Sequence, residues 1–207
     1  NFSMRALVTG GAKRLGREIS LYLANRGYDV AVHYNSSENE ALDVAKEINS
    51  QGRLSECLKC DLLIEDQVKA LVPLASEALG GPISMLVNNA SIFEHDSFDD
   101  ATRASWDRHM ESNLRAPFVL TQAFSKQSPS PILDKKNEPI SQGLVLNMID
   151  QRVKKLTPDF ASYTIAKMGL WAMTQTAARA LAPNIRVNAI GPGPTLIGAR
   201  QKEYHFD

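Results

Sequence analysis

A short apolar run near the start of the chain leads through a glycine-rich turn into an amphipathic pattern. The run Arg5-Ala6-Leu7-Val8 predicts a buried strand, and a helix is expected to begin near Arg17. Between them lies Thr9-Gly10-Gly11-Ala12-Lys13-Arg14-Leu15-Gly16. Glycines in such a turn let a pyrophosphate approach main-chain N–H groups at the N-terminus of the helix. The strict G-x-G-x-x-G spacing is absent, so the turn favours a nucleotide-binding α/β fold, with an ordinary strand-to-helix turn as the alternative.

The rest of the chain alternates predicted strands with amphipathic helices and contains no internal repeat. This order predicts one α/β domain, a Rossmann-type doubly wound parallel sheet with helices on both faces. Residues 128–142, rich in proline and lysine, predict a mobile surface loop. Strands are expected at Arg5–Thr9, Asp29–Tyr34, Arg53–Cys60, Ser84–Asn88, Gly143–Ile149 and Ile185–Ala189, and two long helices near Thr102–Gln127 and Tyr163–Leu181.

Length and composition agree with a single domain and exclude two classes of partner. The chain has 207 residues, is 43% hydrophobic and carries no formal net charge, so it has no electrostatic attraction to nucleic acid or anionic lipid. No apolar run approaches the roughly 20 residues that cross a bilayer, and no signal peptide precedes Met4. We therefore expect a cytoplasmic protein whose domain spans residues 4–207, with residues 1–3 left outside it.

Tyr163 and Lys167 lie four residues apart, a spacing that places both side chains on the same face of a helix. A free phenol has a pKa of roughly 10, and an ammonium beside it stabilises the phenolate and lowers that pKa toward neutrality. The pair therefore predicts a proton donor. A half-exposed tyrosine beside a surface lysine gives the same spacing, so the pair gains weight only from its companions.

The glycine-rich turn and the Tyr-x-x-x-Lys pair together resemble the short-chain dehydrogenase/reductase family. That family carries Thr-Gly-x-x-x-Gly-x-Gly near the start and Tyr-x-x-x-Lys past the middle. The resemblance runs from Ala6 to about Thr195 and implies a catalytic set of Asn113, Tyr163 and Lys167, in which Asn113 holds a water that relays protons to Lys167. Further matches are Asn88-Asn89-Ala90 after a strand, Asn113 in a helix, and Asn188-Ala189-Ile190-Gly191-Pro192-Gly193 beside the nicotinamide.

Three departures from the common family pattern resemble one subgroup, the pteridine reductases. Arg14 replaces the middle glycine of the turn, Ser91 follows Asn-Asn-Ala, and Asp150 stands where most members have a catalytic serine. Phe93 lies where pteridine reductases stack an aromatic ring on the pterin. The resemblance therefore implies a substrate site formed by Arg14, Ser91, Phe93, Asp150 and Tyr163.

The chemistry of Asp150 gives an independent argument for such a substrate. A serine hydroxyl donates a hydrogen bond to a carbonyl, whereas an ionised carboxylate only accepts and repels a developing alkoxide. Pterins offer N–H groups, and reduction of their C=N bonds needs a proton on nitrogen, which Tyr163 or a protonated Asp150 can supply. The alternative is a loop aspartate that caps the next segment.

The end of the second predicted strand indicates which dinucleotide binds. An NAD site normally carries Asp or Glu there, which grips the ribose 2′-hydroxyl and repels a phosphate. Here Tyr34-Asn35-Ser36-Ser37 is uncharged, and we expect Arg14, His33 and Ser36 to hold the 2′-phosphate of NADPH, unless Arg14 is a solvated surface residue. The full predicted cofactor site comprises Gly10, Lys13, Arg14, Leu15, Gly16, His33, Tyr34, Asn35, Ser36, Asp61, Leu62, Asn89, Ala90, Ser91, Tyr163, Lys167, Pro192 and Gly193.

The function predicted from these residues is NADPH-dependent hydride transfer to a pterin-like C=N substrate. Two alternatives stay open: a carbonyl reductase of the same family, acting on a ketone or a 3-oxoacyl substrate, and a non-enzymatic dinucleotide-sensing protein. In the family the two long helices pack against a partner subunit, which implies a homodimer or homotetramer.

Two further features bear on metals and on the end of the chain. Cys57 and Cys60 form a C-x-x-C pattern, but residues three apart on a strand point to opposite faces and no second pair completes a ligand set, so no metal site is expected. Members of the family usually continue for some tens of residues past the Pro-Gly turn. The substrate-covering helix and the last strand are therefore expected to be missing from this chain.

Overall fold

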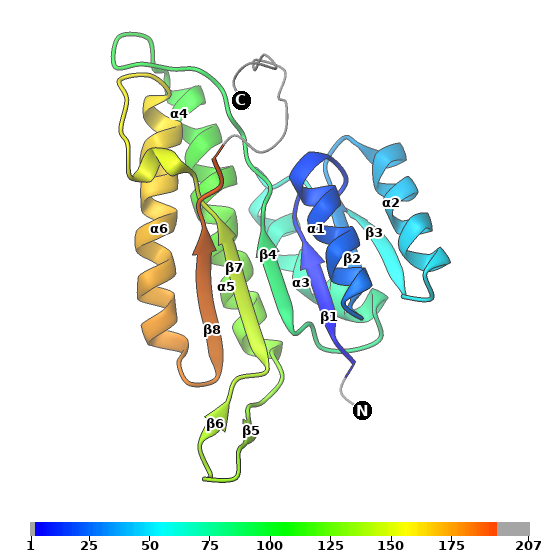
Figure 1. Ribbon diagram of the computed structural model, residues 1–207. Helices are drawn as coiled ribbons and strands as arrows, with labels where there is room; N and C mark the ends of the chain where they lie inside the picture. The colour runs from blue at the N-terminus through cyan, green and yellow to red at the C-terminus, as the bar shows by residue number, and fades with distance from the viewer. Residues whose placement is uncertain (1–2, 194–207) are drawn as a thin grey trace.

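A six-stranded parallel sheet forms the centre of the structure, a computed structural model that describes residues 3–193 (Figure 1). The strands lie in the order β3-β2-β1-β4-β7-β8, and all neighbours in this sheet pair in parallel. The predicted Rossmann-type sheet is therefore confirmed. Its strands are β1 (Arg5–Val8), β2 (Asp29–Tyr34), β3 (Ser55–Lys59), β4 (Met85–Asn88), β7 (Gly143–Met148) and β8 (Ile185–Ile190).

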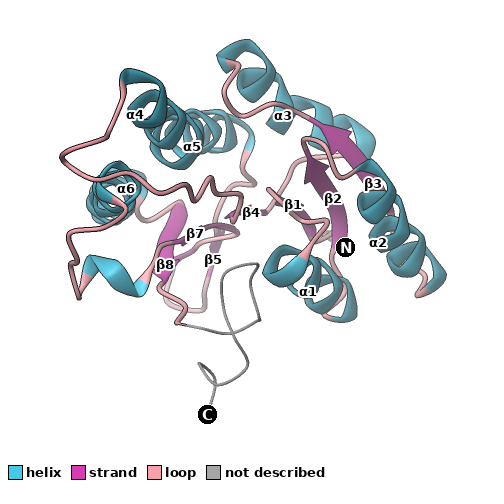
Figure 2. Ribbon diagram, turned by 90° about the horizontal axis from the view of Figure 1, so that it is seen from above, coloured by secondary structure: helices cyan, strands magenta, loops and turns pink. Residues whose placement is uncertain are grey.

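Helices cover both faces of this sheet. On one face lie α1 (Arg14–Asn25) and α2 (Glu38–Ser50). On the other face lie α3 (Glu65–Ala78), α5 (Ala116–Gln127) and α6 (Ala161–Leu181) (Figure 2). None of the helices that the structure describes is long and apolar enough to cross a membrane.

Strand β1 shows how the sequence separates the two layers. Leu7 packs in a cluster with Leu71 of α3 and Phe124 of α5, whereas Ala6 and Val8 belong to the cluster beneath α1 and α2. Successive residues of a strand point to opposite faces, so a strand that is covered on both sides must be apolar throughout. This is why the run after Met4 lacks the alternation of a half-exposed strand.

The long helix predicted at Thr102–Gln127 is divided in the structure. Its first part, α4 (Arg103–Met110), begins at a capping box in which Thr102 and Ser105 exchange hydrogen bonds of 3.0 Å. A π-helical turn at Glu111–Arg115 then separates α4 from α5. Such turns are short, and apolar periodicity does not reveal them.

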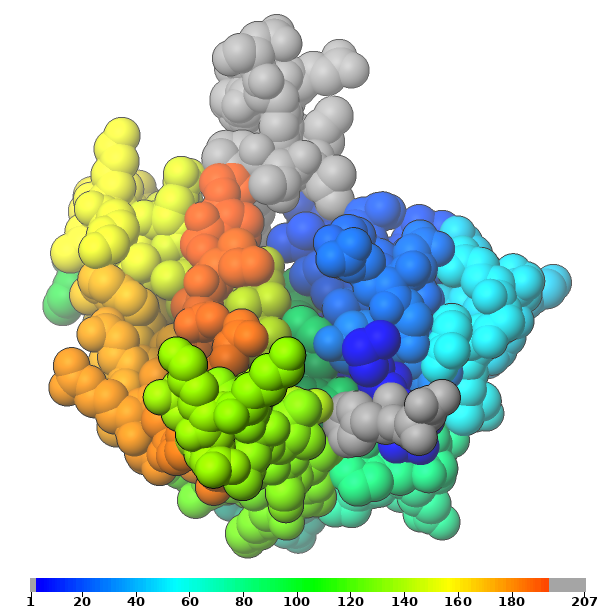
Figure 3. All heavy atoms as spheres, turned by 60° about the horizontal axis from the view of Figure 1, so that its bottom comes forward, coloured from blue at the N-terminus to red at the C-terminus, as the bar shows by residue number. Residues whose placement is uncertain are grey.

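The segment predicted as a mobile loop, 128–142, contains a small hairpin instead. Strands β5 (Ile132–Leu133) and β6 (Pro139–Ile140) pair antiparallel, and the hairpin projects from the end of the molecule where β7 begins (Figures 1 and 3). The side chain of Asp134 closes its turn by accepting the N–H groups of Lys136 and Glu138 at 2.7 and 2.9 Å. These short-range bonds order a segment whose composition alone favoured a loop.

The direction of the connections reverses between β1 and β4. From β1 the chain winds outward through β2 to β3, and from β4 it winds the other way through β7 to β8. In doubly wound sheets, ligands bind at this reversal, beyond the carboxyl ends of the strands. The expectation of a missing last strand and helix concerns the chain after Gly193, which lies outside the described residues.

Candidate active site

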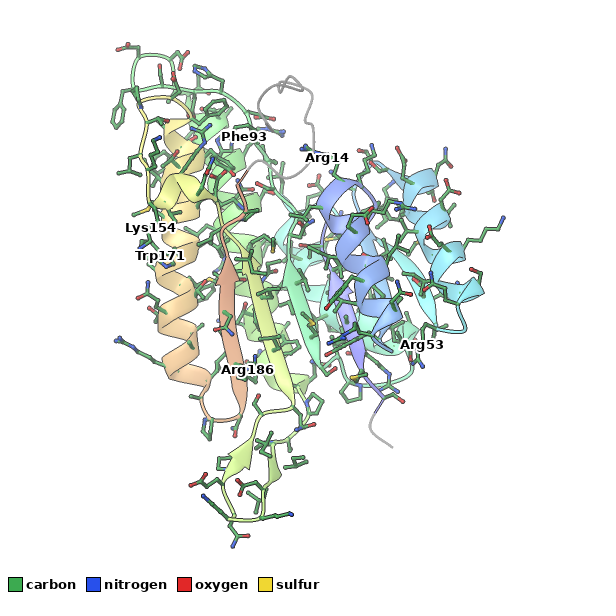
Figure 4. All side chains as sticks on the ribbon, in the orientation of Figure 1. Arg14, Arg53, Phe93, Lys154, Trp171 and Arg186 are labelled. Carbon is green, nitrogen blue, oxygen red and sulfur yellow. The ribbon has the colours of Figure 1, made fainter. Side chains whose placement is uncertain are left out.

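A cavity of about 640 Å³ opens beyond the carboxyl ends of β1, β4 and β7. Arg14 and Phe93, distant in the sequence, both lie at this end of the sheet (Figure 4). The predicted residues Tyr34, Ser36 and Asn113 do not line the cavity. The other predicted residues do: Gly10, Lys13, Arg14, Leu15, Gly16, His33, Asn35, Asp61, Leu62, Asn89, Ala90, Ser91, Phe93, Asp150, Tyr163, Lys167, Pro192 and Gly193.

The hydroxyl of Thr9 joins the turn after β1 to the turn after β4. Its oxygen accepts the N–H groups of Asn89 and Ala90, each at 3.0 Å, and its proton goes to the carbonyl of Val87 at 3.3 Å. The side-chain amide of Asn89 donates back to the carbonyls of Thr9 and Gly10 at 3.1 and 3.2 Å. The two turns are thereby fixed relative to each other and form one wall of the cavity.

Gly10 and Gly16 occupy positions where a side chain does not fit. Gly10 has a φ of +60°, and a Cβ on Gly16 would overlap the carbonyl oxygen of Gly10 and lie 2.6 Å from Nδ2 of Asn89. A larger residue at position 16 must therefore displace the backbone. Close packing of this kind leaves main-chain N–H groups at the start of α1 open to a pyrophosphate, so the turn fits a dinucleotide.

Arg14 begins α1 in the left-handed region, with a φ of 50°. The helix thus begins earlier than the predicted start near Arg17. The common family pattern has glycine at position 14, and the glycine-like backbone is retained although arginine has a Cβ. Because this conformation costs about 1 kcal/mol or more, we infer that the arginine side chain has a role of its own at the cavity that it lines.

His33 lies beneath the glycine turn and is buried. Its Nδ1 accepts the N–H of Gly10 and its Nε2 donates to the carbonyl of Cys60, both at 2.9 Å. Burial lowers the pKa of His33, so the ring is neutral at neutral pH. This geometry contradicts the prediction that His33 holds a 2′-phosphate, because both ring nitrogens are engaged within the protein. The neighbouring Tyr34 also turns away and donates its hydroxyl to Glu38 at 3.1 Å.

Tyr163 donates its hydroxyl proton to Oδ2 of Asp150 at 2.8 Å. The other oxygen, Oδ1, accepts the N–H of Arg152 at 2.8 Å and caps the 3-10 turn Gln151–Val153. Asp150 therefore caps the next segment and also faces the cavity, so its two interpretations are compatible. Burial, followed by the charge and hydrogen bond of Asp150, raises the pKa of Tyr163. At neutral pH the phenol keeps its proton, as a proton donor must.

Lys167 is almost fully buried, with 3% of the residue exposed. Its Nζ donates to the carbonyl of Met148 at 2.8 Å and lies 5.8 Å from the centre of the Tyr163 ring. Burial lowers the pKa of Lys167 to about 8, against the opposing effect of Asp150. The pKa of Tyr163 is nevertheless raised and not lowered as predicted, because burial and the carboxylate of Asp150 dominate it.

Asn113 lies in the π-helical turn and acts on the cavity through another residue. Its Oδ1 accepts the N–H of Ile92 and its Nδ2 donates to the carbonyl of Ile92, both at 2.8 Å. These bonds fix the backbone between Ser91 and Phe93, which both line the cavity. The water relay to Lys167 stays a prediction.

Phe93 belongs to an aromatic cluster at the edge of the cavity. Its ring stacks on Phe160 with centroids 4.3 Å apart and an interplanar angle of 16°, and it meets the ring of Tyr163 edge-on at 4.7 Å. The guanidinium carbon of Arg152 lies 4.9 Å from the centre of the Phe160 ring. Phe93 nevertheless stays 44% exposed. The cluster therefore holds Phe93 beside the phenol while part of the residue is accessible to a flat ligand.

The cysteine pair has the properties of structural thiols. Cys57 and Cys60 are both free, and burial raises the pKa of each thiol to about 11. A thiol that keeps its proton is a poor nucleophile and a poor metal ligand. Within residues 3–193, no group of three or more His, Cys, Asp or Glu side chains is placed to hold a metal ion.

Several residues of the cavity were not predicted from the sequence. Except for Arg108, they lie one or two positions from a predicted residue, so each motif extended by two positions would have included them. Arg108 is different, because only the packing of α4 brings it to the site, where it pairs with Glu94 at 2.7 Å. The unpredicted lining residues are Leu63, Ile92, Arg108, Ser112, Met148 and Ile149.

Residues 4–206 match the family model described as short chain dehydrogenase. The chain therefore belongs to the short chain dehydrogenase family, which confirms the resemblance seen in the sequence. Among curated relatives, the 3-oxoacyl-[acyl-carrier-protein] reductases FabG of Staphylococcus epidermidis and Staphylococcus aureus are each 33% identical to it over 189 residues, which cover 91% of this chain and 73% of theirs.

Solved structures that resemble the chain have nucleotides bound. FolM alternative dihydrofolate reductase 1 from Brucella canis, crystallised with NADP, is 45% identical, with a TM-score of 0.85 over 94% of this chain and 75% of that one. The Brucella suis protein, also with NADP, is 45% identical, with the same TM-score over 95% and 78%. A blue fluorescent protein from a metagenomic library, in complex with NADPH, is 31% identical, with a TM-score of 0.85 over 95% and 79%. These neighbours agree with the predicted class of cofactor.

Proposed function

We propose that this chain is an NADPH-dependent reductase of a pterin-like C=N substrate, with Tyr163 as the proton donor. The observation that carries the proposal is the hydrogen bond from Tyr163 to Asp150 beside the partly exposed ring of Phe93. A proton donor, a carboxylate acceptor and a flat aromatic surface thus meet in one cavity. A flat ring that carries N–H groups matches all three.

NADPH fits the other half of the cavity. The glycine turn leaves room for a pyrophosphate, and the three residues between β2 and α2, including Asn35 at the cavity, carry no acid to repel a 2′-phosphate. Arg14 supplies a positive charge across the turn, and the neighbouring Lys13 pairs with Glu40 at 3.1 Å. When bound, NADPH supplies the hydride.

The protein's own part in the reaction is to hold, deliver and replace a proton. Tyr163 keeps its proton on Oη because its pKa is raised, and it releases that proton to the ring nitrogen of the substrate as the C=N bond is reduced. Asp150 then accepts a hydrogen bond from an N–H group of the ring in place of the phenol. The ammonium of Lys167 stabilises the phenolate left behind until solvent returns a proton.

The structural neighbours favour a pterin-type substrate over a carbonyl. The FolM proteins are named dihydrofolate reductases, a reaction on a pterin ring, and are 45% identical to this chain. A second candidate, reduction of a 3-oxoacyl thioester or a ketone, is favoured by the FabG relatives at 33% identity. The carboxylate of Asp150 opposes this second candidate, because it faces the site where a developing alkoxide needs a hydrogen-bond donor.

Steady-state oxidation of NADPH tests the two candidates directly. Dihydrobiopterin and dihydrofolate are compared with a simple ketone and a 3-oxoacyl thioester, at equal concentrations of enzyme and NADPH. We expect kcat/KM for a dihydropterin to exceed that for either carbonyl by at least about tenfold. The opposite order contradicts the proposal, and NADPH binding without turnover of any substrate favours the dinucleotide-sensing alternative.

We also infer that the outer faces of α5 and α6 pack against a second copy of the chain, as a homodimer or as part of a homotetramer. A groove of about 720 Å³ lies there, and Phe118 within it is 43% exposed. Sedimentation equilibrium is expected to show an oligomer that Phe118→Glu dissociates, and a wild-type monomer contradicts the inference. The apolar lining consists of Met110, Leu114, Phe118, Met173, Ala177, Ala180 and Leu181.

A further inference from the structure

Behind the phenol of Tyr163, three polar side chains form a fully buried network. Asp96, His109 and Ser162 are 2%, 0% and 1% exposed. Oδ1 of Asp96 accepts the N–H of Ser162 at 3.0 Å, and Oδ2 accepts its hydroxyl. Nδ1 of His109 lies 2.6 Å from the same hydroxyl, and Nε2 of His109 accepts the N–H of Glu94 at 3.1 Å.

These contacts define the protonation state of His109. Because the N–H of Glu94 can only donate, Nε2 must be the unprotonated nitrogen of the ring. The ring hydrogen is therefore on Nδ1, where it points at the hydroxyl of Ser162, and the hydroxyl in turn donates a hydrogen bond to Asp96. The donors and acceptors in this series of hydrogen bonds are all satisfied only when His109 is neutral.

The network contains Ser, His and Asp, but it is not a nucleophilic triad. In such a triad the carboxylate orients the histidine and the histidine accepts the serine proton. Here Asp96 accepts the hydrogen bond of the Ser162 hydroxyl, and His109 donates a hydrogen bond to Ser162. Ser162 is also closed to solvent, so no substrate carbonyl can reach it. The arrangement therefore serves position and not covalent chemistry.

The network links the two residues on which substrate reduction depends. Glu94 follows Phe93 directly in the chain, and Ser162 precedes Tyr163. The ring of His109 also meets the ring of Tyr163 edge-on, with centroids 5.9 Å apart. A shift of His109 must therefore move Phe93, Tyr163 or both.

We propose that His109 is a positioning residue that holds Phe93 in register with Tyr163 and does so only as the neutral, Nδ1-protonated ring. This rests on the proposed function, since it assigns Phe93 and Tyr163 to one substrate. A protonated His109 would direct an Nε2–H against the N–H of Glu94, and two donors repel. The loop that carries Phe93 would then separate from α4.

The groups around His109 set the pH at which this happens. Burial lowers its pKa most strongly, while Asp96, at 4.0 Å, and Glu94 raise it. Arg108 on α4 lowers it further, and the carbonyl of Ser105 raises it slightly. From α6, the facing groups are Ser162 and the protonated phenol of Tyr163. The net pKa is below the ordinary value, so the contact is intact at neutral pH and is lost on acidification.

Two substitutions of His109 separate its two hydrogen bonds. In His109→Gln the amide oxygen can take the place of Nε2 and accept the N–H of Glu94, while in His109→Asn the amide reaches only as far as Nδ1 and leaves that N–H without an acceptor. Neither amide titrates. His95→Gln is the matched control, because His95 lies on the same loop but is exposed and contacts Asp159 and Phe160 instead of this network.

The first measurement is amide hydrogen exchange at Glu94 in the intact protein without substrate. The protection factor is the intrinsic exchange rate of an amide divided by its observed rate. We expect the wild-type protection factor of this amide to be high at neutral pH and to fall on acidification. His109→Gln should keep its protection to lower pH, and His109→Asn should lose protection about tenfold or more at all pH values. A Glu94 amide equally protected in all three proteins overturns the proposal, whatever the substrate of the enzyme is.

The second measurement is the pH profile of kcat for dihydropterin reduction. We expect an acid decline in the wild type that His109→Gln moves to lower pH and His95→Gln leaves in place. His109→Asn should lower kcat about tenfold at neutral pH with little change in the Kd for NADPH. An unchanged acid decline in His109→Gln contradicts the proposal. Absence of dihydropterin turnover in the wild type contradicts the proposed function instead, and the exchange measurement still decides the role of His109.

Discussion

The phenol of Tyr163 and the carboxylate of Asp150 share a hydrogen bond of 2.8 Å, so the proposed proton donor is bonded directly to the residue that replaces the family serine. Burial and then the charge of this carboxylate raise the pKa of the phenol, whereas an uncharged serine at that position would add no charge effect. The pair is suited to a substrate nitrogen, which both needs a proton and offers N–H groups.

Removal of the phenol hydroxyl is expected to stop the chemistry and to spare the cofactor. Tyr163→Phe should lower kcat by about 10²–10⁴-fold and leave the Kd for NADPH nearly unchanged, because only the transferable proton is lost. Lys167→Ala should lower kcat and raise the Kd for NADPH, since Lys167 donates a hydrogen bond to the carbonyl of Met148 at the cavity wall. Stopped-flow turnover and fluorescence titration measure the two effects, and near-normal turnover in Tyr163→Phe rules out this mechanism.

Substitution of Asp150 is expected to change which substrate is preferred. Asp150→Ser should lower kcat/KM for a dihydropterin and raise it for a ketone, because the acceptor is replaced by a hydroxyl donor. Asp150→Asn is the matched variant, since its amide oxygen can still cap Arg152 while the charge is gone. The ratio of the two kcat/KM values is the measurement. Equal loss for both substrates in Asp150→Ser would mean that Asp150 only supports the turn that follows it.

Arg14→Gly should separate the stability of the turn from its charge. Glycine adopts a positive φ without strain but has a larger unfolded-state entropy, so the free energy of unfolding should stay constant or rise by up to about 1 kcal/mol. Affinity for NADPH should fall about tenfold relative to affinity for NADH as the guanidinium is removed. Arg14→Lys keeps both the strain and a positive charge and serves as the control. Unchanged preference for NADPH in Arg14→Gly contradicts the role of Arg14 at the 2′-phosphate.

Stability is expected to fall as the pH drops from about 7.5 to about 5.5. Burial lowers the pKa of His33 and of His109 in the folded protein. At pH values between the folded and the unfolded histidine pKa, the unfolded chain binds more protons than the folded one. The free energy of unfolding therefore decreases as the pH falls below about 6.5, the pKa of an unfolded histidine. Urea denaturation at several pH values measures the slope. His33→Gln removes one titrating ring and should make the slope shallower, and an identical slope contradicts the assignment to His33.

The parts of the fold that follow from local pattern were predictable, and the parts that depend on tertiary contact were not. The apolar run of β1 predicts a buried strand, and the glycines after it predict a tight turn that leaves space for a ligand. The π-helical turn around Asn113 is different, because it is tied to the backbone of Ile92, which lies far away in the sequence. His33 was assigned to the cofactor because its place after β2 was visible, but the partners that occupy its nitrogens, Gly10 and Cys60, were not.

Side-chain charge was likewise easier to predict than its effect. The pairing of Tyr163 with Lys167 follows from helical spacing, but the dominant influence on the phenol comes from burial and from Asp150, on another element. Phe93, predicted to contact the substrate, does line the cavity. Its stacking on Phe160 could not be foreseen, because Phe160 has a positive φ that no sequence rule anticipates for phenylalanine.

The hairpin β5–β6 and the cavity lie at opposite ends of the same strand. The hairpin feeds into β7 at Gly143, whereas the cavity opens beyond Met148, at the other end of that strand (Figure 1). Extra sequence placed at the exposed tip near Lys135 would therefore grow away from the reacting groups. One end of the molecule thus carries the cavity, and the other end can accept an insertion. The tip is therefore a suitable attachment point for a reporter or an immobilising tether.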